Sequence, residues 1–129
     1  MSATAESPKA IVLSDGRHLE LRALSADAAM LAIGAFDGER LAGQLRLVAV
    51  TPRAAEVRVV LDPAYHGVRL GTWLLLDAIH AASHLELEQL VADPPVDTDH
   101  ATALAHFDFV MRDGESRLMK VLHRGWPRF

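Results

Sequence analysis

The chain has 129 residues, of which 50% are hydrophobic and 23% are charged. This length suits one domain with a packed core, and the composition excludes wholesale disorder. No run approaches the ~18 apolar residues of a membrane span. The polar, acidic start is unlike a secretory signal. Cysteine is absent, which excludes disulfides, thiolate metal sites and a cysteine nucleophile. We therefore expect a cytoplasmic protein with no membrane partner.

The charge balance bears on the choice of partner. Thirteen Lys and Arg stand against 17 Asp and Glu, a net charge of −4 with neutral His. Such a domain as a whole repels a phosphate backbone, so we expect no nucleic-acid partner.

The first half of the chain is typical of strands joined by tight turns. We expect residues 1–9 to form a flexible tail. Asp-Gly pairs at Asp15-Gly16 and Asp37-Gly38 lie between apolar or alternating runs, the strongest short signal for a hairpin. The predicted strands are Ala10–Leu13, His18–Leu24, Met30–Phe36, Leu41–Val50 and Glu56–Leu61.

The hydrophobic period changes from Leu70 onward. Apolar residues recur at helical spacing over Leu70–His84, which predicts an amphipathic helix. A second helix is expected over His100–Phe107. Further strands are expected at Leu87–Ala92, Phe109–Arg112 and Arg117–Leu122. A single domain over residues 10–122 and a C-terminal tail over 123–129 follow from this pattern.

The stretch from Leu61 to Thr72 is the most informative. A strand leads into a short polar loop with two glycines, and the loop leads into a helix. Backbone N–H groups at a helix N-terminus favour an anion, and glycine allows its close approach. The same pattern also suits an ordinary strand-to-helix turn.

The order of these elements resembles the GNAT N-acetyltransferase superfamily, and within it the acetyltransferase domain of bacterial protein-lysine acetyltransferases. His66-Gly67-Val68-Arg69-Leu70-Gly71 is similar to the family's Arg/Gln-x-x-Gly-x-Gly/Ala loop, which holds the coenzyme A pyrophosphate. The N-terminal hairpin, Leu31–Leu47, Asp97–Phe109 and the final hairpin are similar as well. The resemblance implies an α/β (α+β) fold: a mixed, mostly antiparallel, twisted sheet of about six to seven strands, a central strand–loop–helix coenzyme site and two main helices.

The resemblance also implies the site residues. Glu56 matches the position of the general base that deprotonates the acceptor amine; the alternative is a solvated Glu at the start of a strand. The residues that would contact acetyl-CoA or coenzyme A are Val59, Val60, Leu61, His66, Gly67, Val68, Arg69, Leu70, Gly71, Thr72 and Asp97. No metal is implied: Asp77, His80 and His84 lie opposite the apolar stripe of their helix, as expected for a solvated face.

Several positions depart from the family pattern. His66 replaces Arg or Gln, Arg69 replaces the middle glycine, and Asp97 replaces Asn. Asp108 replaces the glycine before Phe109, and Leu104 stands where many members have a tyrosine acid. Two helices that normally follow the first strand, and that wall the acceptor side, are nearly absent.

Two functions follow from the resemblance. The first is acyl-CoA-dependent N-acyltransfer, from acetyl-CoA to a primary amine, a protein lysine being one candidate. The alternative is a catalytically inactive module that binds acyl-CoA or a protein partner. Because Met30, Ala32 and Phe36 give one strand a second apolar face, and the covering helices are missing, we also expect a homodimer.

Overall fold

The computed structural model places one sheet of eight strands against two helices. It describes residues 9–25, 29–93, 98–111, 114 and 116–122, with the backbone alone for 98–100. The strands are β1 (Lys9–Val12), β2 (His18–Ala23), β3 (Leu31–Asp37), β4 (Arg40–Thr51), β5 (Ala54–Leu61), β6 (Gln89–Ala92), β7 (Val110–Met111) and β8 (Leu118–Val121). The helices are η2 (Pro63–Tyr65), a 3₁₀ turn, α1 (Leu70–His84) and α2 (Thr98–His106).

The sheet is antiparallel except at one junction. Its strand order is β1-β2-β3-β4-β5-β6-β8-β7, and only β5 and β6 pair in parallel. The expected mixed, mostly antiparallel sheet with two main helices is confirmed, with eight strands. Residues 1–8 and 123–129, where we expected tails, lie outside the described residues, and β1 begins at Lys9.

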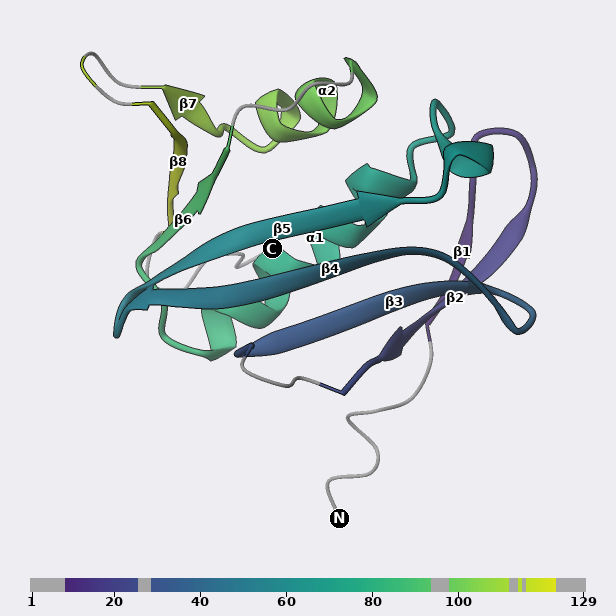
Figure 1. Cartoon of the computed structure of the whole chain (residues 1–129), viewed down its shortest axis with the longest axis horizontal. Helices are drawn as coiled ribbons and strands as arrows, with labels where there is room; N and C mark the ends of the chain where they lie inside the picture. The colour runs from purple at the N-terminus through teal and green to yellow at the C-terminus, as the bar shows by residue number, and fades with distance from the viewer. Residues whose placement is uncertain (1–8, 26–28, 94–97, 112–113, 115, 123–129) are drawn as a thin grey trace.

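Helix α1 covers one face of the sheet and forms the centre of the core (Figure 1). Leu70, Leu74, Leu75, Ala78 and Ile79 are fully buried on its inner side. The facing strands alternate, so that Leu45 and Leu47 of β4 point inward and are fully buried. Helix α2 packs beside α1 through Ala103 and Leu104. Leu104 is therefore a core residue, not a free place for an acid.

Lys120 ties the last strands to α2. Its ammonium donates a hydrogen bond of 2.8 Å to the carbonyl of Phe107, just past the end of α2. The residue is only 7% exposed, and this burial lowers the pKa of the amine. A cation near helix C-terminal carbonyls is favourable.

The opposite face of the sheet carries no helix among the described residues. Only residues 24–30 connect β2 to β3. This connection is too short to hold the two helices that the family has at this place. Part of the second apolar face is nevertheless covered by the chain itself. Ala32 is 2% exposed, Phe36 is half-buried, and the Arg22 guanidinium lies 4.6 Å from the centre of the Phe36 ring.

Candidate functional site

The parallel junction between β5 and β6 is short, and the two strands then diverge (Figure 1). Three pairs join them: Ala54 with Gln89, Ala55 with Leu90, and Glu56 with Val91. β5 continues to Leu61 and remains paired with β4 along its other edge. Within the described residues, the β6-side edge of β5 beyond Glu56 therefore has no strand neighbour.

The direction of the backbone groups along this open edge follows from one hydrogen bond. The N–H of Asp62 donates to the carbonyl of Ala42, just beyond the paired part of β4. Successive peptide groups in a strand point to opposite edges. The backbone groups of Val59 and Leu61 thus point toward the opening, and those of Val60 point toward Gln44 of β4. Of the three strand residues in the predicted coenzyme site, two present their backbone to the gap.

The loop after β5 is built around the buried ring of Tyr65. Its hydroxyl donates a 2.7 Å hydrogen bond to Asp37, and the guanidinium of Arg17 lies 4.2 Å from the ring centre. Asp62 caps η2 by accepting from the N–H of Ala64 at 2.9 Å, and also pairs with Arg40 at 3.0 Å. These contacts lower the pKa of the Asp62 carboxyl. Tyr65 is thus a packing residue that fixes the loop.

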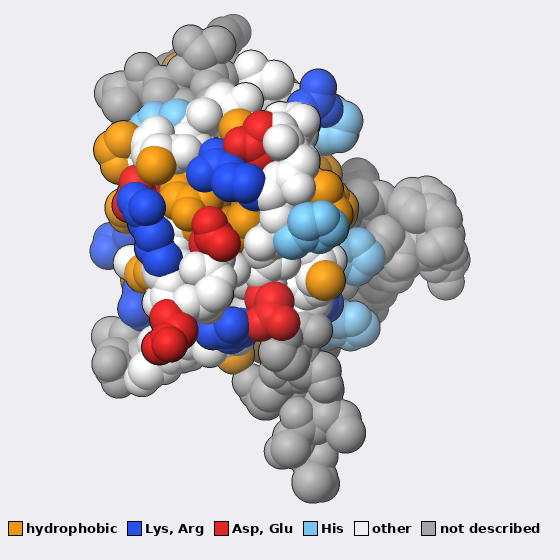
Figure 2. Space-filling view, turned by 90° about the vertical axis from the view of Figure 1, so that its right-hand side faces the viewer, with side chains coloured by type: hydrophobic (Ala, Val, Ile, Leu, Met, Phe, Trp, Pro, Cys, Tyr) orange, Lys and Arg blue, Asp and Glu red, His pale blue; other side chains and the backbone are white. Residues whose placement is uncertain are grey.

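This end of the molecule is mixed in charge (Figure 2). The pairs Arg17–Asp15 and Arg40–Asp62 lie at the turns that flank the loop. The β1–β2 turn also contacts the loop directly, because the N–H of Ser14 donates to the carbonyl of Val68 at 3.2 Å. The loop is therefore held from two sides before the helix begins.

The remaining loop residues form an open cradle at the start of α1. Gly67 has φ +76°, and a Cβ there would meet no atom within 4 Å. A Cβ at Gly71 would meet only Leu61, at 3.9 Å. Within the described part of the chain, the N–H groups of Leu70, Gly71 and Thr72 have no acceptor, as in the first turn of any helix. Backbone donors thus face space that an anion can enter.

Arg69 is the helix N-cap residue and has a left-handed backbone, with φ 69°. This conformation costs a non-glycine residue about 1–2 kcal/mol. Its side chain is exposed and makes no hydrogen bond or ion pair with a described residue. His66 is also exposed, and its ring nitrogen Nε2 lies 3.3 Å from the carbonyl oxygen of Leu61. Asp97 lies outside the described residues.

Glu56 lies where β5 and β6 begin to diverge, and its side chain is 13% exposed. Its Oε1 accepts from Arg58 at 2.8 and 2.9 Å, and its Oε2 accepts from Arg117. Arg117 also donates to Asp93 at 2.8 Å, and its pKa is raised: burial lowers it, but Asp93 and Glu56 more than offset this. Glu56 is therefore not a solvated strand end. It is the centre of an ion-pair network that links β5 to the segment before β8.

Sequence reasoning missed both arginines. The spacing Glu56-x-Arg58 places the two side chains on one face of a strand, so Arg58 could have been found. Arg117 is 61 positions from Glu56 and is brought there only by the pairing of β8 with β6.

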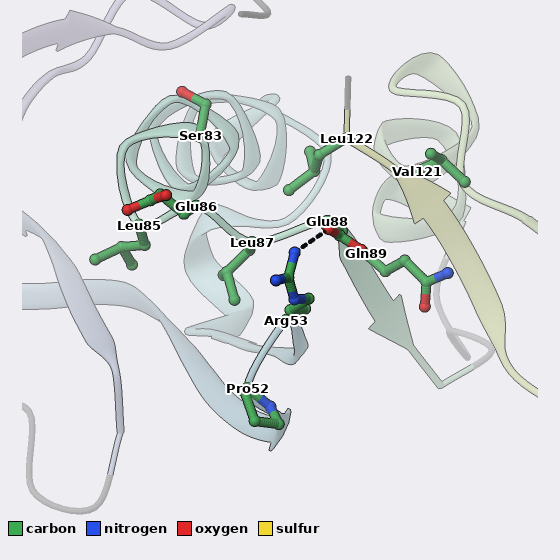
Figure 3. A pocket seen from close by; sticks show the side chains of 10 residues that line it. All are labelled: Pro52, Arg53, Ser83, Leu85, Glu86, Leu87, Glu88, Gln89, Val121 and Leu122. Atoms are coloured by element: carbon green, nitrogen blue, oxygen red, sulfur yellow. Dashed lines mark hydrogen bonds and ion pairs between the residues drawn. The ribbon is translucent and has the colours of Figure 1, made fainter. Parts of the chain in front are cut away.

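A pocket of about 700 Å³ lies away from this region, around the C-terminal end of α1 (Figure 3). Arg53 and Glu88, which line it, form an ion pair. A second pocket, of about 480 Å³, is lined by Asp77, His80 and His84 among others, and Asp77 pairs with Lys9. No group of three or more His, Asp or Glu among the described residues could hold a metal ion. The candidate site is thus an open strand edge and loop, not an enclosed cavity.

The comparisons agree with this geometry. The sequence profile of the acetyltransferase (GNAT) family matches residues 4–109. The chain belongs to this family. Acyl-CoA-dependent acyl transfer is the chemistry of this family. No curated protein sequence matches the chain significantly.

Solved structures of the GNAT fold are similar at low identity. The GNAT domain of S. lividans PAT has a TM-score of 0.76 at 15% identity, covering 89% of this chain and 97% of its own. A cAMP-binding acyltransferase from Mycobacterium smegmatis has a TM-score of 0.77 at 14% identity, covering 95% of this chain and 49% of its own. The GNAT chain thus spans about half the length of that protein. A putative acetyltransferase from Salmonella typhimurium, with its cofactor acetyl-CoA, has a TM-score of 0.62 at 15% identity, covering 72% and 65%.

One further finding concerns the helices of this GNAT domain. In the described part of the chain, none has both the length and the apolarity needed to cross a bilayer.

The buried hydroxyl of Tyr65 gives a direct test of the loop. Because the hydroxyl donates to Asp37 and is buried beside that carboxylate, the pKa of Tyr65 is raised above its ordinary value of 10.0. Un-ionised Tyr65 thus contributes stability that is fully present below pH 10 and is lost as the pH rises through the folded pKa. Tyr65 is the only tyrosine, so the ultraviolet absorbance of phenolate reports it alone.

We expect the absorbance midpoint to lie above pH 10 in the folded protein and to fall in Asp37→Asn. The unfolded chain in denaturant is the reference. An equal midpoint in the folded and unfolded chains would contradict the Tyr65–Asp37 contact.

Proposed function

We propose that this domain transfers an acetyl group from acetyl-CoA to a primary amine. The observation that carries the proposal is the open edge of β5, which leads directly into the cradle at the start of α1. A pantetheine arm has amide groups that pair with the exposed backbone of Val59 and Leu61. The coenzyme pyrophosphate suits the N–H groups at Leu70 to Thr72.

The backbone of β5 binds the thioester, and Glu56 serves as the base. Held along β5, the thioester carbonyl lies near backbone donors, which stabilise the negative charge that develops on its oxygen. The amine nitrogen forms a bond to the carbonyl carbon as the carbon–sulfur bond breaks. Glu56 accepts the amine proton directly or through water, because a protonated amine cannot attack. Coenzyme A leaves as thiolate or, after protonation, as thiol.

A protein lysine and a small amine both satisfy this scheme. The similarity in fold to the GNAT domain of S. lividans PAT does not favour a protein lysine over a small amine, because other structures of the same fold are equally compatible with a small amine. The alternative function, binding of acyl-CoA without catalysis, is favoured by one observation: both oxygens of Glu56 are occupied by arginines. Turnover measurements with Glu56 variants distinguish the two functions.

Coenzyme binding is tested best at Arg69. We propose that its guanidinium contacts a coenzyme phosphate, which offsets the strain of its backbone. Arg69→Gly should not lower the free energy of unfolding, because the left-handed strain is relieved. It should raise the Kd for coenzyme A roughly 10-fold or more, measured by calorimetry.

Arg69→Asn is the matched control, since Asn tolerates the left-handed region but lacks the charge. It should weaken binding as the glycine variant does. Undiminished binding in both variants removes Arg69 from the site. Failure of the unmodified protein to bind either coenzyme A or acetyl-CoA would overturn the enzyme and the acyl-CoA-binding functions together.

Catalysis is tested at Glu56. Glu56→Gln keeps the shape of the side chain but cannot take a proton, so kcat should fall by ~10²–10⁴ with coenzyme binding nearly unchanged. Thiol release from acetyl-CoA with a panel of amines measures this.

Asp93→Asn is the control for the ion-pair network, because it removes the other carboxylate that Arg117 contacts and leaves Glu56 intact. Its kcat should stay within a few-fold of the unmodified enzyme. Equal turnover in Glu56→Gln and the unmodified protein would leave Glu56 with a structural role only.

We also propose that the domain forms a homodimer through the part of the helix-free sheet face around Phe36 of β3, to one side of Glu56 and its arginines. Phe36 remains partly exposed there, although Arg22 covers part of its ring. Met30, which we expected on this face, instead packs against the core on the α1 side. Sedimentation equilibrium at micromolar concentration should give twice the mass of one chain, which is 14.1 kDa. A mass of one chain would refute the homodimer.

A further inference from the structure

The helix-free face of the sheet is rich in arginine beside Glu56. Arg46 of β4 and Arg58 of β5 are directly opposite each other in the antiparallel register. Both point away from α1, because they alternate with the buried Leu45, Leu47 and Val57. Like charges placed directly opposite on neighbouring strands are destabilising. A cation pair at this position therefore needs an explanation.

Within the described residues, the chain does not provide a carboxylate partner for each of these two arginines. Arg58 pairs with Glu56, although its side chain remains 61% exposed. Arg46 contacts no carboxylate among the described residues: its hydrogen bonds, both 3.3 Å long, go to the side chain of Gln44 and the carbonyl of Ser25. By contrast, Arg22 on the same face pairs with Glu20 at 2.7 Å. Arg46 thus differs from Arg22 in having no carboxylate partner within the described ranges.

The local charge is opposite in sign to that of the whole chain. Arg58 and Arg117 pair with Glu56, Arg117 also pairs with Asp93, and Arg46 lies opposite Arg58 on the next strand, so that three cations stand against two carboxylates. The chain as a whole has a net charge of −4. A bare ammonium ion approaching Glu56 meets these guanidinium groups, whereas an amine that also carries an anion brings the charge they lack.

We propose that the acceptor is a small amine that carries a carboxylate a few bonds away, as in a free amino acid, and that Arg46 and Arg58 bind this carboxylate. This inference rests on the proposed function and names its acceptor class. The Arg58–Glu56 ion pair, with its 2.8 Å contact, exchanges partners with the acceptor. The carboxylate takes the guanidinium of Arg58, and the ammonium takes Oε1 of Glu56.

This exchange replaces the Arg58–Glu56 ion pair with two ion pairs to the ligand, and it places the amine on the base that deprotonates it. Arginine suits the task, since its planar fork binds a carboxylate through two parallel hydrogen bonds.

The experiment compares acceptors that differ only in the anion. The standard L-α-amino acids are assayed beside their carboxamides, which keep the amine and lack the carboxylate. Lysine peptides flanked by glutamate form a third arm. Amino acids should be the better acceptors, and Arg46→Gln should raise their KM roughly 10- to 100-fold, with kcat changed little and carboxamide kinetics unchanged.

Arg22→Gln is the matched control, because Arg22 lies on the same face but has its own carboxylate partner. It should leave both KM values unchanged. Equal use of acids and carboxamides, preference for the peptides, or equal effects of Arg46→Gln and Arg22→Gln would each overturn the proposal.

A binding measurement distinguishes failure of the proposed acceptor site from failure of the proposed acetyl transfer. In ¹⁵N NMR spectra, the Nε–Hε signals of Arg46 and Arg58 should shift with added amino acid and not with its carboxamide, in the presence of coenzyme A. If these signals shift but no amine is acetylated, the acceptor site stands and catalysis fails. If coenzyme A binds and the signals do not move, the acceptor site fails.

Discussion

The arrangement of this molecule depends on where β5 parts from β6. Both strands keep a complete partner on their outer edges, β4 for β5 and β8 for β6. The sheet can therefore split after three shared pairs without unfolding either half. The inner edge of β5 is left with backbone donors and acceptors that water or a ligand must satisfy. The loop, the helix start and Glu56 are all arranged around this split.

The cradle at the start of α1 combines backbone donors with a strained residue. Two positions where the family pattern has glycine carry Arg69 and Asp108 here, and both have positive φ, 69° and 66°. The backbone has thus kept the glycine-type conformation although the side chains have changed. Asp tolerates this region comparatively well, and Asp108 ends α2 with its N–H donating to Ala105. Arg69 has no such compensation within the described chain.

Local signals predicted most of the fold. The helix Leu70–His84 was predicted to its end residues because its apolar period is uninterrupted, and Asp-Gly turns marked the hairpins. The order of elements pointed to the strand-to-helix loop and to Glu56 as candidates for the site. The partners of Glu56 were not predicted, because Arg117 is brought beside it only by the pairing of β8 with β6. Arg46 and Arg58 lie opposite each other because of the register between β4 and β5, and this register cannot be read from the sequence of either strand alone.

The narrow junction has a consequence for the motions of the protein. In the described part of the chain, β6 shares only three residue pairs with β5, and the arm formed by β6, β8 and β7 is otherwise held by side chains: Leu90 and Ala92 in the core, and the ion pairs Arg117–Glu56 and Arg53–Glu88. Few hydrogen bonds must break for this arm to swing as a unit, whereas the β2–β5 meander is paired along most of its length. Opening at this junction breaks fewer backbone hydrogen bonds than opening of the meander, and hydrogen exchange of the amide protons is the property that registers such a difference.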